Sequence, residues 1–230
     1  MRSVKLTPLN KKVKIRYTQK LVQLSQKRKN EIEEFWTKIN QDDLFHRGEV
    51  FNVKSLTERE RSYDILLTQT DYAHYLYTVR NKILDDEGCK VIFGSGLIET
   101  KDSVFVFGEM ANHTAYPGRL QCAGGGLSWE DKAGDYFDVK QSVLREINEE
   151  LGLNLNEHIK QCTPVFLKSG GTYDFFSILY HIKLKITQSE LMEIYGQFTE
   201  DLLRQDKFPE FQNLVCVENN EKSIMNFFER

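Results

Sequence analysis

Residues 138–151 are the segment that most narrows what this chain can fold into. At 100° per residue, apolar side chains recur along one face of a helix over this range, and Gly152 follows as a stop. The apolar positions are Val139, Val143, Leu144, Ile147 and Leu151. Such a face has to be packed against a core, and a chain of 230 residues is long enough to build one. The pattern therefore predicts a buried amphipathic helix in a globular protein.

Three glutamates lie on one stripe beside this apolar face. Glu146, Glu149 and Glu150 stand at positions i, i+3 and i+4, within about 100° of one another around the helix. Like charges at i, i+4 spacing repel by roughly 0.2–0.5 kcal/mol, so folding gains nothing from the stripe. Hard divalent cations such as Mg²⁺ prefer oxygen ligands, and binding one removes the repulsion. The stripe therefore predicts a cation site.

Two neighbouring features suit the same chemistry. Arg145 precedes Glu149 by one helical turn, where it can hold that carboxylate by a charge-assisted hydrogen bond. The run Gly124-Gly125-Gly126 upstream has no side chains, so its carbonyls or amides can approach a metal ion or a phosphate closely. We interpret the glycines and the helix as parts of one site.

The stretch from Arg145 to Leu153, with the glycines upstream, resembles the signature of the Nudix hydrolases. That signature runs glycine, five residues, glutamate, seven residues, and then Arg-Glu-apolar-any-Glu-Glu-any-Gly-apolar. Residues 145–153 match its second half at every position. The first half departs from it, because Phe137 stands where the glutamate is expected and Asp131 where the glycine is expected.

The loop between the glycines and the helix is consequently longer than the pattern. Gly125 lies six residues before position 131, and Ala123 replaces the proline that often precedes the glycine pair. The loop is acidic, and none of its acids takes the missing glutamate's role from sequence alone. They are Glu130, Asp131, Asp135 and Asp138. Because of this departure, the resemblance does not predict the path of the loop, but the prediction of the helix is unaffected.

The resemblance implies roles for the matching residues. Glu149 and Glu150 would be metal ligands, and Glu146 would be a further ligand or the base that activates water. Arg145 would orient the glutamates, and the carbonyl of Gly124 (or of Gly125) would complete the metal shell. The implied cofactor is Mg²⁺, with Mn²⁺ as a substitute. The implied reaction is attack of water on a diphosphate linked to another group.

Further residues near the glycines are candidates for substrate binding. They are Gly125, Gly126, Trp129 and Arg119. Trp129 can stack on a base or sugar, or it can pack the loop onto its domain, as Tyr136 and Phe137 can. Arg119 can reach a phosphate, or it can stay solvated at the surface.

The rest of the chain alternates strand and helix patterns. Residues 4–7 and 13–17 alternate apolar and polar around Pro8 and Asn10, which predicts a hairpin. Helices are predicted within 18–40, after Asp71, over 187–203 behind the capping box of Thr187 and Glu190, and over 220–228. Strands are predicted at 49–56, 62–68, 90–98, 104–107, 120–123, 165–167, 175–183 and 214–217.

This interleaving predicts an α+β fold. The charged run that ends at Gly88 is the best internal boundary, so we expect an N-terminal α/β lobe over residues 1–88 and a second domain over residues 89–230. For the second domain, the resemblance implies a Nudix-like α/β/α sandwich built on a mixed sheet.

Composition places the chain among soluble globular proteins. No apolar run reaches the ~20 residues of a bilayer crossing, and the four cysteines form no CxxC pair, so we expect a cytoplasmic protein with reduced thiols. Residues 1–30 hold ten basic residues and no acid. A basic arm can bind nucleic acid, but the strand-like alternation in this region favours the solvated face of ordinary elements. We therefore expect neither a nucleic-acid nor a membrane partner.

Short matches in the first ninety residues are similar to the Nudix subgroup that hydrolyses UDP-glucose and UDP-galactose. They are Phe35-Trp36, Leu44-Phe45 and Thr70-Asp71-Tyr72. The implied function is Mg²⁺-dependent hydrolysis of the diphosphate bond in a nucleoside-diphosphate-linked small molecule. A nucleotide sugar comes first, giving a nucleoside monophosphate and a sugar phosphate. An ADP-ribose or dinucleotide pyrophosphatase and a non-catalytic Nudix-like sensor stay open as alternatives, as does the oligomeric state.

Overall fold

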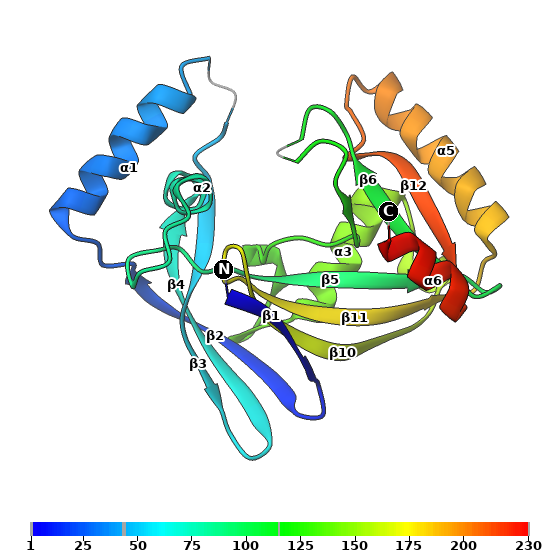
Figure 1. Ribbon diagram of the computed structural model, residues 1–230, viewed down its shortest axis with the longest axis horizontal. Helices are drawn as coiled ribbons and strands as arrows, with labels where there is room; N and C mark the ends of the chain where they lie inside the picture. Colours follow the sequence, from blue (N-terminus) through cyan, green and yellow to red (C-terminus); the bar gives the residue numbers. More distant parts are fainter. Residues whose placement is uncertain (1, 43–44, 115, 230) are drawn as a thin grey trace. The chain divides into compact units, whose positions relative to one another are not determined.

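The computed structural model describes residues 2–42, 45–114 and 116–229 (Figure 1). Its helices are α1 (Gln26–Ile39), α2 (Tyr72–Asn81), α3 (Val139–Leu151), α4 (Leu155–His158), α5 (Gln188–Arg204) and α6 (Glu221–Phe228), with a 3₁₀ turn η1 (Trp129–Asp131). Its strands are β1 (Arg2–Pro8), β2 (Lys12–Leu21), β3 (Glu49–Glu58), β4 (Ser62–Asp71), β5 (Ile92–Glu99), β6 (Val104–Met110), β7 (Leu120–Gln121), β8 (Lys132–Ala133), β9 (Tyr136–Phe137), β10 (Ile159–Gly171), β11 (Phe176–Leu184) and β12 (Phe211–Glu218). This mixture of helices and sheets confirms the predicted α+β class.

In the described part of the chain, the strands form two sheets. One has seven strands in the order β1-β10-β11-β5-β6-β12, with β7 paired to β6. The other has five strands in the order β3-β4-β2-β9-β8. The second sheet is mixed, because β4 runs parallel to β2 and antiparallel to β3. The parallel pair needs a crossover connection, which α1 and β3 provide.

The chain divides into two compact units, each made of separate segments. Unit 1 comprises Met1–Phe93, Gly126–Val139 and Phe166–Ile178. Unit 2 comprises Gly94–Gly125, Lys140–Val165 and Leu179–Arg230. Three strands, β5, β10 and β11, contribute residues to both units. The division into domains at residues 88 and 89 is a linear one and stays a prediction.

The predicted hairpin at the N-terminus is wrong, although both of its strands form. Strand β1 pairs with β10, with Lys5 opposite Ser169. Strand β2 pairs with β4 instead, with Ile15 opposite Ile65, and on its other side with β9. Alternation of apolar and polar residues specifies that a segment is a strand, but it does not specify the partner.

Helix α1 begins later than the periodicity of residues 18–40 predicts. Strand β2 runs on to Leu21, and the helix starts at Gln26 behind Ser25. The Ser25 hydroxyl accepts a hydrogen bond from the Arg28 backbone N–H at 3.2 Å, which satisfies one of the free donors at the helix start. The cap, and not the apolar spacing, therefore sets where α1 begins.

The other helix of unit 1 begins where the sequence predicts. The Asp71 carboxylate accepts a hydrogen bond from the His74 backbone N–H at 2.9 Å and caps α2. Helices α1 and α2 lie side by side (Figure 1), and the Phe35 and Tyr77 rings meet edge to face at 5.5 Å. Leu44, one of the residues that suggested the UDP-sugar subgroup, lies outside the described residues.

The lengthened loop folds as part of unit 1. It contains η1, β8 and β9, and β9 pairs with β2 through Phe137 and Ile15. Asp131 is fully buried and accepts hydrogen bonds from the Ser128 backbone N–H at 2.8 Å and from the Ser128 hydroxyl at 3.3 Å. Local capping thus occupies this acid, one of those that the sequence left without a role.

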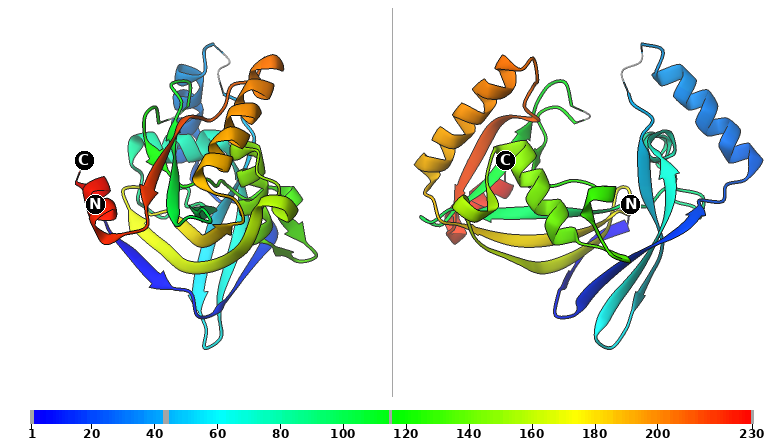
Figure 2. Two further views of the ribbon diagram at one scale, coloured as in Figure 1. Left: turned by 90° about the vertical axis from the view of Figure 1, so that its right-hand side faces the viewer. Right: turned by 180° about the vertical axis from the view of Figure 1, so that it is seen from behind.

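In unit 2, α3 packs against β5 and β11 (Figure 2). A methyl group added at Gly96 of β5 would lie 2.7 Å from Ile182 Cδ1 on β11 and 3.0 Å from Ile147 Cδ1 on α3. This glycine lets helix and sheet approach closely, so that Val143 and Ile147 are fully buried. The apolar face of α3 therefore lies where the sequence predicts, and Gly152 follows with a φ of +69°.

Helix α5 and strand β12 complete unit 2. The capping box of Thr187 and Glu190 forms as predicted, with the Thr187 backbone N–H donating to Glu190 Oε2 at 2.7 Å. The Tyr195 hydroxyl donates to the Phe211 carbonyl at 2.6 Å and ties α5 to β12. Phe211 itself is fully buried. This hydrogen bond thus holds α5 against the first residue of β12.

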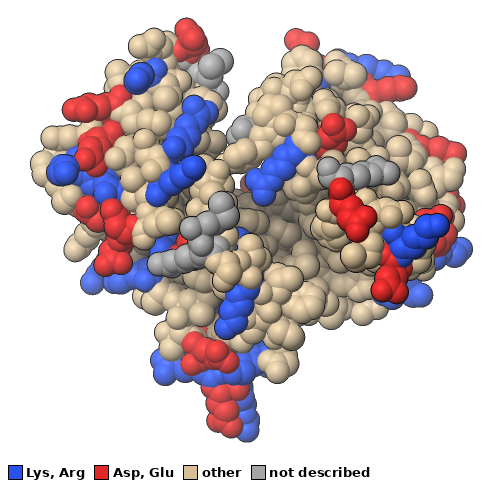
Figure 3. Space-filling view, viewed as in Figure 1, with Lys and Arg blue, Asp and Glu red and all other residues tan. Residues whose placement is uncertain are grey.

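Charged side chains of both signs are interspersed over the face drawn in Figure 3. Several N-terminal basic residues form ion pairs within unit 1: Lys11 with Glu58, and Arg28 with Glu31 and Asp85. The Lys11 and Arg28 side chains are only 22% and 12% exposed, so they do not match the predicted solvated face, whereas Lys12, Lys14 and Arg16 are exposed and do. No helix in the described ranges is both long and apolar enough to cross a bilayer. None of the four cysteines is joined in a disulfide bond.

His74 on α2 is buried and hydrogen-bonded at both ring nitrogens. Nε2 lies 2.8 Å from the Glu87 carbonyl, which can only accept, so Nε2 carries the proton. Nδ1 accepts from the Thr70 hydroxyl at 2.8 Å. Burial lowers the pKa of His74, and the charge of Arg28 acts in the same direction. Together they outweigh the hydrogen bond to the Glu87 carbonyl and the charges of Asp71 and Glu87, which raise this pKa. The native state therefore keeps this imidazole neutral.

We expect the free energy of unfolding to decrease as the pH falls below about 6.5, where His74 of the unfolded chain takes up a proton and native His74 does not. The unfolded state then binds more protons, so stability is lost down to the lowered native pKa. Chemical denaturation near pH 7.5 and near pH 5.5 should show a larger loss for the wild type than for His74→Gln. Exposed His46→Gln should follow the wild type, and identical pH dependence of wild type and His74→Gln would contradict the expectation.

Candidate active site

Gly124 joins the glycine run to the carboxylate stripe of α3. Its backbone N–H donates to Glu150 Oε2 at 2.9 Å. Its φ is +144°, and a Cβ there would collide with the Gly94 carbonyl oxygen. Only glycine fits this position, because both the backbone conformation and the space exclude a side chain. The group that Gly124 presents to Glu150 is thus its amide; the predicted role of its carbonyl in a metal shell stays a prediction.

Gly125 brings the backbone against a second glutamate. A Cβ built on Gly125 would lie 2.5 Å from the Glu146 carboxyl carbon and 2.5 Å from its Oε1. The Gly125 carbonyl accepts a hydrogen bond from the Gly94 backbone N–H at 3.1 Å, so the strand neighbour already uses this oxygen. The Glu146 carboxylate therefore lies in the space that a side chain at position 125 would fill, and we call this space the Gly125 cradle.

Arg145 holds two of the three glutamates. Its Nη1 lies 2.9 Å from Glu146 Oε1 and 2.9 Å from Glu149 Oε2. In this arrangement the guanidinium is the internal counter-ion of the stripe, which offsets the repulsion between the two carboxylates. The sequence predicted the contact with Glu149; the contact with the adjacent Glu146 is additional.

The three glutamates differ strongly in burial. The Glu149 side chain is 54% exposed and that of Glu146 is 16% exposed, whereas residue Glu150 is only 3% exposed. Burial raises the pKa of Glu146 and raises that of Glu150 to about 9. Among the described residues no cation pairs with Glu150, and ionising a buried carboxyl group that has one backbone donor is costly. Glu150 is therefore the glutamate that gains most from a bound cation.

Glu210, immediately before β12, is a fourth carboxylate of this cluster. Its charge raises the pKa of Glu150, second only to burial, and it also raises that of Glu146. Burial raises the pKa of Glu210 itself, and nearby His113 opposes this. Sequence reasoning missed Glu210, because it is sixty positions from Glu150 (210 − 150 = 60) and belongs to no motif. The only local signal was a glutamate directly before an apolar strand.

The donor set suits a hard divalent cation. It consists of carboxylate oxygens from Glu146, Glu149, Glu150 and Glu210, which is the chemistry that Mg²⁺ and Mn²⁺ prefer. Within the described ranges, no three His, Cys, Asp or Glu side chains are already arranged to hold a metal ion. Arg145 and the Gly124 amide occupy oxygens of the stripe instead. A cation would have to displace Arg145 from Glu146 and Glu149.

The remaining predicted site residues fall into different units. Arg119, Gly124 and Gly125 belong to unit 2 with the glutamates, whereas Gly126 and Trp129 belong to unit 1. The Arg119 guanidinium lies over the Tyr116 ring, 5.2 Å from its centre. Gly126 forms an isolated bridge with Phe93. Roles in substrate binding stay predictions for all of them.

Trp129 is part of an aromatic cluster within unit 1. Its ring meets Tyr17 edge to face at 4.9 Å and Phe51 at 5.0 Å, and it lies 6.0 Å from Phe137. The indole N–H donates to Glu49. These contacts match the packing interpretation of the loop aromatics, although the Trp129 side chain keeps an exposed portion.

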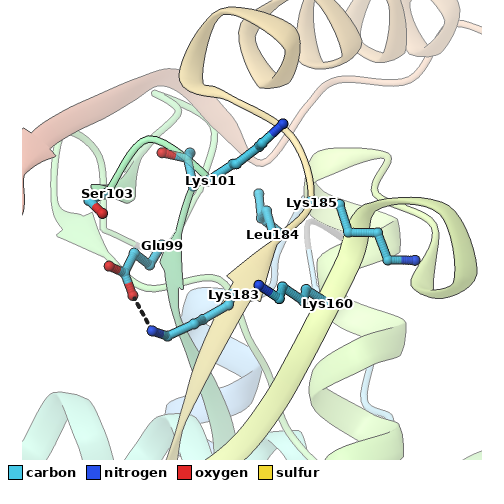
Figure 4. Close-up of a pocket in the computed structure, with 8 residues that line it drawn as sticks. Glu99, Lys101, Ser103, Lys160, Lys183, Leu184 and Lys185 are labelled. Atoms are coloured by element: carbon cyan, nitrogen blue, oxygen red, sulfur yellow. Dashed lines mark ion pairs between the residues drawn. The ribbon is translucent and has the colours of Figure 1, made fainter.

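A hollow of about 320 Å³ lies elsewhere on unit 2 and is lined by four lysines (Figure 4). They are Lys101, Lys160, Lys183 and Lys185. Lys183 pairs with Glu99 at 3.6 Å, and Glu99 also accepts from His181 at 2.7 Å and from Asn219 at 3.0 Å. The one acid of this hollow is thus engaged, and none of the predicted site residues lines it.

No protein-family model matches this chain, and no curated protein matches it. Solved structures similar to it include DR0079 from Deinococcus radiodurans, with 15% identity, 61% of this chain and 74% of that one covered, and a TM-score of 0.39. A bifunctional NMN adenylyltransferase/ADP ribose pyrophosphatase from Francisella tularensis has 11% identity, 69% and 43% coverage, and a TM-score of 0.41. A NUDIX hydrolase from Nitrosomonas europaea has 12% identity, 56% and 58% coverage, and a TM-score of 0.35.

Proposed function

We propose that this chain is a Nudix-type hydrolase. In this proposal it uses a divalent cation, Mg²⁺ or Mn²⁺, to hydrolyse the diphosphate bond of a nucleoside-diphosphate-linked compound. A nucleotide sugar is the first choice of substrate, and the products are a nucleoside monophosphate and a sugar phosphate. The observation that carries the proposal is the buried carboxylate cluster around Glu150. Burial and the charge of Glu210 both oppose ionisation of Glu150, and among the described residues no cation pairs with Glu150, so a bound cation would supply the charge that this site lacks.

The chain's own residues contribute positioning and charge to this reaction. The Gly124 amide holds Oε2 of Glu150, and Arg145 holds Oε1 of Glu146 and Oε2 of Glu149. Arg145 would release these two oxygens when a cation binds them. A bound cation would neutralise the diphosphate and polarise the attacked phosphorus. We assign Glu146, partly buried in the Gly125 cradle, to accept the proton of the attacking water; burial and the charge of Glu210 raise its pKa, which makes it a stronger base.

The choice of a nucleotide sugar rests on what the carboxylates cannot recognise. With a cation they hold only the diphosphate, so groups on either side of it must be selected by other surfaces. This chain has the predicted N-terminal lobe of residues 1–88 and a lengthened loop with exposed Trp129 and Tyr136. A compound with a group at each end of the diphosphate can use such surfaces, whereas a nucleoside triphosphate has only one such group.

A hydrolysis screen tests this function. The purified chain is incubated with Mg²⁺ or Mn²⁺ and with UDP-glucose, ADP-ribose, a dinucleotide or ATP, and the products are separated by chromatography. We expect kcat/KM to be higher for a nucleotide sugar or ADP-ribose than for ATP, and excess chelator to abolish turnover. Preference for ATP, or release of a nucleoside diphosphate and free sugar, would contradict the assignment. Tight binding of these compounds without turnover would favour the sensor alternative instead.

A further inference from the structure

A second hollow of unit 2 adjoins the carboxylate cluster. It has a volume of about 470 Å³ and shares Glu210 with the cluster. It is lined by Met110, His113, Thr114, Tyr116, Gln121, Phe208 and Glu210. Gln121, which also lines the hollow, stands three residues before Gly124, whose N–H contacts Glu150. The hollow therefore lies next to the glutamates, and a molecule whose diphosphate is held there can extend into it.

Aromatic rings form the wall of the hollow. Phe208 is 69% exposed, and its ring lies 5.8 Å from that of His113 at an interplanar angle of 51°. Tyr116 stands beneath the Arg119 guanidinium, which limits the freedom of its ring. A large apolar ring held in water is unfavourable for the chain alone, and a flat ligand would cover it.

Hydrogen bonds hold this wall in place. After α5, the Lys207 backbone N–H donates to the Leu202 carbonyl at 2.9 Å, and Asp206 adopts a φ of +61°, so Phe208 follows an ordered turn. On the opposite strand, the Met110 backbone N–H donates to the Arg119 carbonyl at 2.9 Å. The exposed ring is therefore presented by fixed backbone and needs little ordering when a ligand binds.

The polar groups of the hollow select which end of the substrate it takes. Glu210 supplies carboxyl oxygens that can accept hydrogen bonds from a ring with N–H donors. Gln121 adds an amide with both a donor and an acceptor, and Thr114 adds a hydroxyl. A planar ring with polar edges combines these requirements, and that is the chemistry of a nucleobase.

We propose that the hollow between His113 and Phe208 binds the nucleobase of the substrate, with Phe208 as the residue that stacks on it. This proposal rests on the proposed function, since it takes the glutamates as the diphosphate site. It places base recognition in unit 2, on residues that the sequence did not single out. The sugar or other group at the opposite end of the diphosphate then lies outside this hollow.

Binding of nucleoside monophosphates tests the proposal without turnover, because they contain no diphosphate. Calorimetry with Mg²⁺ present compares AMP and UMP with ribose 5-phosphate, which lacks a base. Loss of one base-stacking contact corresponds to roughly 5- to 150-fold weaker binding. We expect Phe208→Ala to weaken binding of the better-bound nucleotide by that factor and Phe208→Tyr to restore it. Neither substitution should change the affinity for ribose 5-phosphate.

Phe228→Ala is the matched control, because Phe228 of α6 is an exposed phenylalanine, at 75%, outside the hollow. It should bind nucleotides as the wild type does. Equal nucleotide binding by Phe208→Ala and the wild type would overturn the proposal, and so would no measurable binding of AMP and UMP by the wild type. Base-dependent binding that requires Phe208 in a chain without hydrolytic activity would keep this proposal and remove the proposed function.

Discussion

Glu150→Gln should lower kcat/KM for the preferred substrate by on the order of 10²–10³-fold, the size expected when one preorganised charge of a catalytic site is removed. Glutamine has nearly the same volume and keeps an oxygen that can accept the Gly124 N–H, so the contact at 2.9 Å survives. What is lost is the negative charge next to Glu210. Steady-state kinetics with saturating Mg²⁺ measure the effect.

The same substitution should leave the free energy of unfolding unchanged or increase it slightly in the absence of metal. Glu150 is 3% exposed, and burial and Glu210 raise its pKa to about 9. Near neutral pH the metal-free native state therefore has to take up a proton at Glu150 that the unfolded chain does not bind, and a neutral amide removes this cost. Denaturation in excess chelator checks this. Glu193→Gln, an exposed change on α5, is the matched control and should alter neither activity nor stability. Wild-type turnover in Glu150→Gln would remove Glu150 from the catalytic site.

Local patterns in this chain predicted elements well where one segment alone decides the structure. The apolar face of α3, the Asp71 cap of α2 and the capping box of α5 each depend on residues within a few positions of one another. Helix periodicity and capping are short-range effects, so a single sequence contains what is needed to predict them.

Pairings between distant segments were not predictable in the same way. The alternation in β1 and β2 marks two strands equally well, but β1 pairs with β10 and β2 with β4. The choice depends on which sheet surface each strand can cover, and that is fixed only when the whole unit has folded. The path of the lengthened loop, through η1, β8 and β9 onto β2, is a second example.

The candidate site shows the same limit in its chemistry. The stripe of Glu146, Glu149 and Glu150 was readable, because helical spacing alone brings the three together. Glu210 was not, because its closeness to Glu150 is created by the packing of α5 and β12, through contacts such as that of Tyr195 with the Phe211 carbonyl. A motif thus located the helix, whereas tertiary structure supplied the fourth carboxylate.

Gly125→Ala should reduce kcat/KM by about 10²-fold, the cost of misplacing a catalytic group by roughly 1 Å. The new methyl group would lie 2.5 Å from the Glu146 carboxyl carbon, so the carboxylate has to leave its cradle and its contact with Arg145. The displaced atoms are the carboxyl group at the far end of the flexible Glu146 side chain, and Gly125 does not have a positive φ. The fold should therefore survive, with a melting temperature within about 2 °C of the wild type.

Substitutions at two other glycines distinguish a loss of activity from a loss of folded stability. Gly124→Ala should destabilise the chain, because its φ of +144° and the Gly94 carbonyl both exclude a Cβ. Gly196→Ala, within α5 and facing open space, should keep full activity and stabilise the helix by up to about 1 kcal/mol. Thermal denaturation and kinetics on the three variants distinguish the cases. If Gly125→Ala retained wild-type kcat/KM, the exact position of the Glu146 carboxylate would not matter to the reaction, and its assignment as ligand or base would have to be abandoned.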